Sequence, residues 1–375
     1  KQLRVGELVT HDGGVPLWHK SYDGQQADLG TVVATMEALR RQIALPECLV
    51  IGDTKLLSEQ VIPALRGMQL HFLAPLPKSA ALDQEYLSLS PEKWERLDYV
   101  AKRQERLGEA QRTTYLGQEV GWERIDPKTG EREWLRRLYV ISSEERATCR
   151  KVRAQQRERA EAELAKIRAG MGKRQLKTLP QVQGRVEQVL SRRHVASLYR
   201  VTLVESFGKL SLSWEVDEAA LLQAEALDGY YVLLTSWPKE KATPHDLLRL
   251  WKQEEVIERR YSDWKGPLQV RPVFVTSNAR MAALLLLLHL ALMIYCLIER
   301  EARRRLAEEG RSKVGRLLAG HVAAVPTGEN ILRAFEALYV IIEEDEHGRQ
   351  YHLSERYPEQ SEIWELLRIP TPVWG

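Results

Sequence analysis

Apolar and polar residues alternate over the first nine positions like a strand, and a turn followed by a second strand predicts a β-hairpin. The two predicted strands are residues 1–9 and 15–22, and His11-Asp-Gly-Gly14 between them is typical turn sequence. Apolar residues then recur at helical spacing from about Leu29 to Ile43, and Asp28 can cap this helix. The chain is therefore expected to open with a hairpin followed by a helix.

A short, continuous apolar run follows at Cys48–Ile51, typical of a strand that is covered on both faces. Asp53 comes directly after this strand. The pattern then predicts a second helix over Leu56–Met68 and another strand over Leu70–Leu73. Hairpin, helix, strand, helix and strand in this order predict one mixed α/β sheet.

The pattern changes at about Leu82, and charged helical segments dominate as far as Ala226. The longest of them is Ser142–Gly172, which is rich in Arg, Glu and Ala. Within this region, Tyr199–Glu205 and Lys209–Val216 alternate with period two around Ser206-Phe-Gly208. These two segments predict a second β-hairpin.

The α/β pattern resumes at Gly229–Ser236, which we interpret as a buried strand. Thr243-Pro-His-Asp246 then predicts a helix start, with threonine at the cap, proline in the first turn and an acid three residues after the cap. We therefore expect a sheet domain split by an insertion. Its parts are 1–81 (first part of the core), 82–226 (helical and β insertion), 227–310 (second part of the core) and 311–375 (a C-terminal helical extension).

The composition fits a folded protein of roughly two domains, since 44% of the 375 residues are hydrophobic and 29% are charged. The net charge of +3 does not by itself indicate a nucleic-acid-binding protein. The basic residues are nevertheless clustered. The clusters are Arg150–Arg159, Lys173–Lys177 and Arg192–His194 in the insertion, and Arg259-Arg260 and Arg303–Arg305 after it.

The first of these clusters allows two interpretations. It contains Glu158 and continues into Glu161 and Glu163, so an ion-paired helix in solvent and a DNA-binding face both remain open. The three cysteines, Cys48, Cys149 and Cys296, are far apart and lack metal-ligand spacing, as in a reduced cytoplasmic protein.

One apolar run, Ala282–Ile298, could be mistaken for a membrane span. It is shorter than the roughly 20 residues that a span needs, and His289 and Tyr295 interrupt it. We expect a buried core helix there and no membrane segment. No cleavable signal is visible, so we expect a cytoplasmic protein.

Glu258 and Lys265 are candidate site residues on the helix that Thr243 starts. They are seven positions apart and therefore project from the same helix face, about two turns from each other. An acid at a metal and a lysine at a phosphate are what metal-assisted phosphoryl transfer requires. The alternatives are an acid and a lysine that are simply solvated.

The same helix shows two heptad-spaced stripes. We expect the apolar stripe to pack on the sheet and so to aim its neighbour at the sheet edge. The first stripe is Leu250, Ile257 and Trp264, and the second is Trp251, Glu258 and Lys265. Asp53 is the natural partner of Glu258, because acids at the carboxyl ends of strands are favoured site positions in open α/β sheets. A turn or helix-cap role is the alternative for Asp53.

Three segments together resemble the DDE transposases of bacterial insertion sequences, in the hairpin-type branch with a β-rich insertion before the third acid. Glu258–Lys265, with the Gly-Pro, Val-Arg-Pro-Val-Phe and Leu-rich sequence after it, resembles their E-x6-K signature. Val50–Ser58 resembles their second-acid strand. Gly14–Asp28 resembles their "G-x-P-L … G-N-x-x-D" stretch, with Gln25 where asparagine is usual.

The resemblance implies a ribonuclease-H-like mixed sheet in which three carboxylates hold two Mg²⁺ or Mn²⁺ ions. Asp53 and Glu258 would be two of these catalytic, metal-binding acids. The first acid is expected on a strand upstream of Lys1, and Asp12 at a hairpin tip is a poor substitute. We therefore expect residues 1–375 alone to be catalytically inactive.

The resemblance also implies DNA-contacting residues. Lys265 would neutralise a phosphate, and Tyr231 matches an aromatic that stacks on a flipped base, although a core role is equally open. Trp251 stands where relatives carry tyrosine, and Glu254 stands where part of the family carries arginine. The remaining candidates for DNA contact are Arg259 and Arg271.

The function implied is cleavage of transposon ends and strand transfer into target DNA. The expected partners are double-stranded DNA, as terminal repeats and as target, and a second copy of the chain in a homodimer. Two alternatives are a non-catalytic DNA-binding remnant of a transposase and a structure-specific nuclease that cuts without joining.

Overall fold

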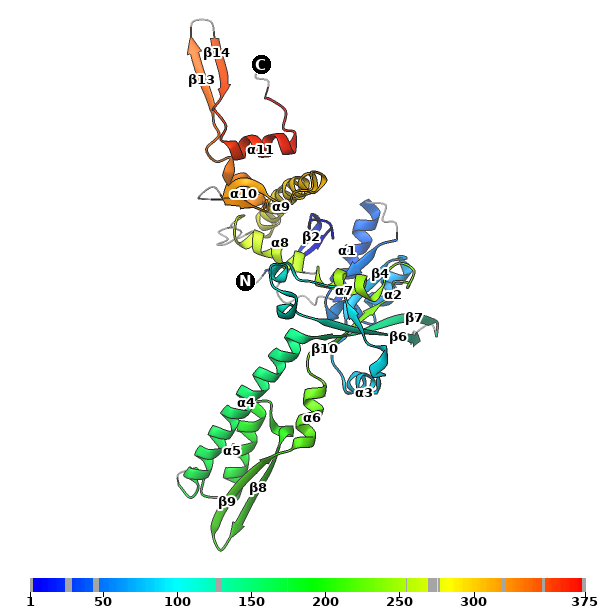
Figure 1. The fold of residues 1–375 in the computed structure, drawn as a ribbon, viewed down its shortest axis with the longest axis vertical. Coiled ribbons are helices and arrows are strands. Elements are labelled where there is room, and N and C mark those ends of the chain that lie inside the picture. The colour runs from blue at the N-terminus through cyan, green and yellow to red at the C-terminus, as the bar shows by residue number, and fades with distance from the viewer. Residues whose placement is uncertain are drawn as a thin grey trace. The chain divides into compact units, whose positions relative to one another are not determined.

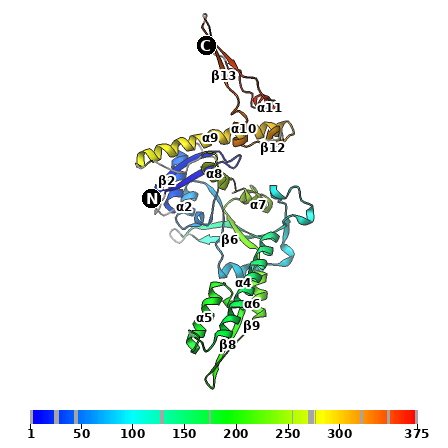
Figure 2. The same ribbon diagram turned by 90° about the vertical axis from the view of Figure 1, so that its left-hand side faces the viewer.

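A computed structural model describes residues 3–23, 29–42, 47–125, 130–173, 175–253, 255–268, 275, 277–318, 322–345 and 348–372. Figures 1 and 2 show the helices and strands of the chain. The chain forms two compact units. Unit 1 consists of Lys1–Pro46 and Lys252–Gly375, and unit 2 is the continuous segment Glu47–Trp251.

Unit 2 is built on a six-stranded mixed sheet in the order β3-β4-β10-β7-β6-β5. The two strands β3 and β4 run parallel, and the other pairs run antiparallel. The mixed α/β class predicted from the sequence is therefore confirmed. The strands are β3 (Leu49–Ile51), β4 (His71–Pro75), β5 (Glu95–Leu97), β6 (Tyr115–Ile125), β7 (Arg132–Ser142) and β10 (Tyr230–Thr235).

Helices cover both faces of this sheet. On one face, α7 (Pro244–Lys252) packs Leu247 and Leu248 against Leu73 and Leu233. On the opposite face, α3 (Ala80–Ser88) contributes residues to a second core cluster. Between β3 and β4, the predicted helix is divided into the 3₁₀ turn η1 (Thr54–Leu57) and α2 (Val61–Gly67).

Three strands of the central sheet come from the region 82–226. The charged helices expected throughout that region begin only at Ser143, because β5, β6 and β7 precede them. The sequence pattern did not reveal the long β6–β7 hairpin, because a charged pair lies inside it. Arg136 and Glu119 are each 9% exposed and form an ion pair. Short 3₁₀ turns, η2 to η4, lie at Pro91–Lys93, Lys102–Gln104 and Glu109–Gln111.

Residues 143–226 form a helix–hairpin module within unit 2. Its helices are α4 (Ser143–Gly170), α5 (Leu179–Arg192) and α6 (Glu218–Ala226), with the 3₁₀ turn η5 (Ala196–Leu198). Its strands, β8 (Tyr199–Ser206) and β9 (Lys209–Val216), confirm the predicted hairpin. The module has its own core, in which Leu164, Val186 and Leu212 are buried.

Unit 1 contains the first hairpin, β1 (Leu3–Val9) and β2 (Pro16–Asp23), together with α1 (Leu29–Gln42). The hairpin and helix are as predicted, but the hairpin is a separate two-stranded sheet among the described residues. The expectation that it belongs to the mixed sheet was wrong. The long helix α9 (Asn278–Glu308) packs along β2 and shares a core cluster with Val5 and Val15. Asp28, the predicted cap of α1, lies outside the described residues.

Only part of α9 is the buried core helix that the sequence predicts. Leu285, Leu292 and Cys296 are buried, whereas Leu287 and Ile294 are 65% and 60% exposed. By length and composition, α9 is the one helix in the described part of the chain that could cross a membrane, and 28% of its apolar window is buried.

The C-terminal extension is not purely helical, so that prediction was wrong. Its described residues contain two hairpins as well as two helices, because short segments such as Val340–Asp345 pair with their neighbours. Its core includes Val314, Ile331 and Ile363. The elements are β11 (Val314–Leu318), β12 (Val322–Ala324), α10 (Gly328–Ala334), β13 (Val340–Asp345), β14 (Gly348–Leu353) and α11 (Pro358–Leu367).

Candidate functional site

Asp53 lies two residues beyond the end of β3, at the carboxyl edge of the central sheet. Its side chain is exposed, and Oδ1 accepts a hydrogen bond of 3.0 Å from the backbone N–H of Lys55. Asp53 is thus the N-cap of η1, as the helix-cap alternative expected. The cap fixes the carboxylate at the strand end, where solvent and a ligand can reach it.

Tyr231 lies on β10, near the same edge of the sheet as Asp53. Because β10 runs antiparallel to β4, the first residues of β10 lie beside the carboxyl end of β4. The ring of Tyr231 is half-buried and packs with the core cluster beneath α7, and burial raises the pKa of its hydroxyl. These contacts favour the core-aromatic interpretation that the sequence left open.

Trp251 does not share a helix with Glu258. The single helix predicted after Thr243 is broken, because α7 ends at Lys252 and α8 (Glu255–Lys265) begins three residues later. The start of α7 is as predicted, with the Asp246 carboxylate accepting a 3.0 Å hydrogen bond from the Thr243 N–H. Glu254 lies outside the described residues.

The two heptad stripes are therefore divided between the two units, and that prediction was wrong. Leu250 and Trp251 pack against the core of unit 2. Trp264 is instead buried in unit 1, where it contacts the cluster that contains Val15 and Leu285. The apolar stripe does not lie on one sheet.

The candidate residues of α8 share one exposed surface. Glu258, Arg259 and Lys265 are all exposed, and Glu258 and Lys265 lie on the same helix face, as their spacing predicts. Among the described residues, the Glu258 carboxylate forms no hydrogen bond or ion pair. The carboxylate is therefore open to a cation. Arg271 lies outside the described residues.

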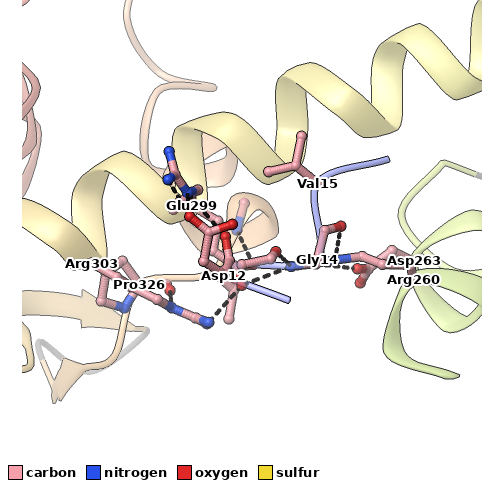
Figure 3. A network of polar contacts seen from close by, with 12 residues as sticks. Asp12, Gly14, Val15, Arg260, Asp263, Glu299, Arg303 and Pro326 are labelled. Atoms are coloured by element: carbon pink, nitrogen blue, oxygen red, sulfur yellow. Dashed lines mark hydrogen bonds and ion pairs between the residues drawn. The ribbon is translucent and has the colours of Figure 1, made fainter. Parts of the chain in front are cut away.

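Arg260 lies beside these exposed residues, but it is only 1% exposed and anchors α8 (Figure 3). Its Nε donates to the carbonyl oxygen of Gly14 at 3.1 Å, and one terminal nitrogen donates to that of Gly13 at 2.5 Å. The other terminal nitrogen donates to the Asp263 carboxylate at 2.8 Å. The sequence pattern grouped Arg260 with the DNA-facing arginines, and the structure shows that it cannot contact DNA directly.

Glu299 of α9 completes this buried network. It is 2% exposed and accepts from Arg260 at 3.3 Å and from Arg303 at 2.7 Å. Its second oxygen accepts from the backbone N–H of Gly328 at 3.2 Å. Burial raises the pKa of Asp263, and the hydrogen bond from Arg260 offsets part of that rise.

The hairpin tip between β1 and β2 is the part of unit 1 that Arg260 holds. Gly14 has a φ of +64°, and a Cβ there would lie 2.3 Å from Val256. Asp12 at the same tip binds Arg300 of α9 and is not a free metal ligand. Burial alone would raise the pKa of Asp12, but the hydrogen bonds from Arg300 and Thr10 hold it below its ordinary value.

The donor chemistry of the two candidate acids suits a hard divalent cation, because both present exposed carboxylate oxygens. Asp53 belongs to unit 2 and Glu258 to unit 1. No group of three or more His, Cys, Asp or Glu side chains that could hold a metal occurs within the described ranges. Each acid is therefore an exposed carboxylate within its own unit.

A comparison with sequence families gives one match. The family described as "Transposase DDE domain" matches residues 7–294, which include Asp53, the six-stranded sheet, α8 and most of α9. Comparisons with curated proteins and with solved structures give no match.

Proposed function

The chain belongs to the transposase DDE-domain family, and we propose that it cleaves transposon ends and transfers the freed strand into target DNA. One observation carries this proposal. Within the matched residues, Glu258 presents an exposed carboxylate on a helix that a buried arginine anchors. Such a carboxylate is pre-positioned for a ligand, because the packing beneath it fixes the helix.

In this proposal, Asp53 and Glu258 bind Mg²⁺ or Mn²⁺ through carboxylate oxygens. A further carboxylate, the family's remaining acid, would complete a site for two ions. When bound, the metal would activate a water or 3′ hydroxyl and would stabilise the leaving oxygen. Asp53 is held for this role by its cap on η1, and Glu258 by the anchoring of α8.

The remaining candidate residues would handle the DNA. Lys265 lies on the same exposed face as Glu258 and would neutralise a phosphate oxygen, and Arg259 beside it adds a second cation. We propose that Arg271 also contacts DNA phosphate. Trp251 and Tyr231 are packed in the core of unit 2, and we propose that they support the wall of the site beneath Asp53.

The partners proposed are the terminal repeats of the element, its target DNA and a second copy of the chain. Two ends must be joined, and a homodimer provides one site for each end. We place this activity in the bacterial cytoplasm, where the DNA is accessible.

A strand-transfer assay tests the proposal, using the chain extended at its amino terminus through the preceding strand. Asp53→Asn and Glu258→Gln are each expected to reduce Mn²⁺-dependent cleavage at least about 100-fold. Glu255→Gln, one turn away on the exposed surface of α8, is the matched control and should retain activity. Full activity in either acid variant would refute the proposal, and cleavage without joining would indicate a nuclease.

A further inference from the structure

Positive charge is concentrated in one stretch of the helix–hairpin module. Residues 150–209 contain 15 Lys and Arg and five Glu, a net charge of +10, whereas the whole chain carries +3. The rest of the chain is therefore net negative. A local excess of this size on one module is typical of a surface that binds a polyanion such as DNA.

Part of this charge is neutralised by ion pairs within unit 2. Arg153 binds Asp228, and Arg192 and Arg193 share Glu163. Other basic side chains are exposed and, among the described residues, form no ion pair. These are Lys151, Arg159, Lys166, Lys173, Lys177 and Lys209. The ion-paired interpretation therefore holds for Arg153, Arg192 and Arg193.

The β8–β9 hairpin has one packed face and one open face. Leu212 and Trp214 on the inner face pack with the module core. The outer face pairs Thr202 with Ser213 and Val204 with Ser211, and these four side chains are exposed. Small hydroxyl side chains on a flat ribbon can donate to phosphate oxygens without steric obstruction.

Phe207 is at the tip of this hairpin, and its side chain is fully open to solvent. Its relative exposure is 104%, the largest among the exposed apolar side chains. Phe207 has a φ of +49° and Gly208 a φ of +71°, which is the backbone of a two-residue turn that ordinarily carries Asn-Gly. A bulky aromatic is costly at a positive φ, so folding of the hairpin does not explain this residue.

We propose that the β8–β9 hairpin binds double-stranded DNA and that Phe207 wedges between adjacent base pairs. Apolar side chains presented on rigid elements unstack base steps in this way, and surrounding cations bind the flanking phosphates. Lys209, which pairs with Ser206 directly beside the turn and is exposed, supplies one such cation. In both views, the tip lies at the end of the module remote from the six-stranded sheet of unit 2 (Figures 1 and 2). The inference rests on the proposed function, because it assumes a DNA substrate.

The test uses residues 1–375 and a 30-base-pair duplex that carries 2-aminopurine, whose fluorescence rises when a neighbouring base is unstacked. The wild-type chain should bind in a salt-dependent manner and raise the fluorescence. Phe207→Asn should abolish the rise and weaken binding about tenfold, as expected for the loss of one aromatic stack. Asparagine suits the positive φ, so this variant keeps the turn and removes only the ring.

Leu222→Ala is the matched control, because Leu222 is 65% exposed on α6 of the same module. It should leave both signals unchanged. If the wild-type chain binds DNA and Phe207→Asn gives the same fluorescence rise and the same affinity, the wedge is refuted and the proposed function stands. If the wild-type chain does not bind DNA, both proposals fail.

Discussion

The Nε of Arg260 donates a buried hydrogen bond of 3.1 Å to the carbonyl oxygen of Gly14, across 246 positions of sequence. This contact joins α8 to the tip of the β1–β2 hairpin. Trp264, one turn after Arg260, is buried with it, so the opposite face of α8 must point outward. Glu258 and Lys265 lie on that outward face because of this anchor.

Replacement of Arg260 should therefore destabilise unit 1. We expect Arg260→Met to lower the free energy of unfolding by about 3 kcal/mol, because Asp263 and two carbonyl oxygens lose their buried donor. Chemical denaturation followed by tryptophan fluorescence measures the change. Arg259→Met, on the exposed neighbour, should alter stability by less than about 0.5 kcal/mol. Equal effects of the two variants would contradict the anchor.

Gly14 should tolerate no side chain. Its φ is +64°, and a Cβ would lie 2.3 Å from Val256 and 2.8 Å from Nε of Arg260. We expect Gly14→Ala to cost about 3 kcal/mol, from the left-handed backbone together with overpacking. Gly130 has a φ of +70°, and a Cβ added there would meet no atom within 4 Å, so Gly130→Ala isolates the backbone cost of about 1–2 kcal/mol. Thermal unfolding of both variants separates the two contributions.

The histidine pair of unit 1 should make stability depend on pH. The rings of His19 and His289 stack at 4.4 Å, and Nδ1 of His289 lies 3.1 Å from the buried Glu7 carboxylate. Burial, and then the charge of His289, lowers the pKa of His19 below 6.5. The unfolded chain then binds more protons below pH 6.5, so stability is complete above that pH and falls as the pH decreases.

The measurement is the free energy of unfolding between pH 7.5 and 5.5, for the wild-type chain and His19→Gln. The variant should show a smaller loss of stability on acidification, because it lacks the group with the lowered pKa. An identical pH dependence in the two proteins would show that His19 is not responsible.

The cysteines should differ in reactivity. Cys296 is fully buried in α9, and burial raises the pKa of its thiol to about 12, so the thiolate is scarce at neutral pH. Cys149 is exposed on α4. Brief treatment of the native protein with iodoacetamide should modify Cys149 and spare Cys296, as read by mass spectrometry. Modification of Cys296 without denaturant would show that the core around α9 opens.

The sequence predicted the elements that are determined by a local pattern of residues. The β8–β9 hairpin and the capped start of α7 were both predicted, because alternation and the Thr243–Asp246 pair are local signals. The β6–β7 hairpin was missed, because its buried Arg136–Glu119 pair resembles solvent-exposed charge. A charged residue is buried only when distant partners satisfy it, and those partners are not visible in sequence.

Some features of the candidate site were likewise predicted from the sequence, and others were not. The helix face shared by Glu258 and Lys265 follows from spacing alone, and so does the strand-end position of Asp53. The break between α7 and α8 was not predicted, since apolar residues continue in register across it. The role of Arg260 was also missed, because its acceptors are backbone oxygens at the hairpin tip, far away in sequence.

We propose that Asp53 and Glu258 bind the same metal, and Fe²⁺-directed cleavage of the protein backbone tests this proposal most directly. With added hydrogen peroxide, Fe²⁺ that occupies such a site is oxidised to Fe³⁺ and produces hydroxyl radicals, which cut the chain near each ligand. We predict cuts near both residue 53 and residue 258, which Mg²⁺ suppresses by competition and which either Asp53→Asn or Glu258→Gln abolishes at both positions. Cuts at one position only, or cuts that survive both substitutions, would contradict the claim.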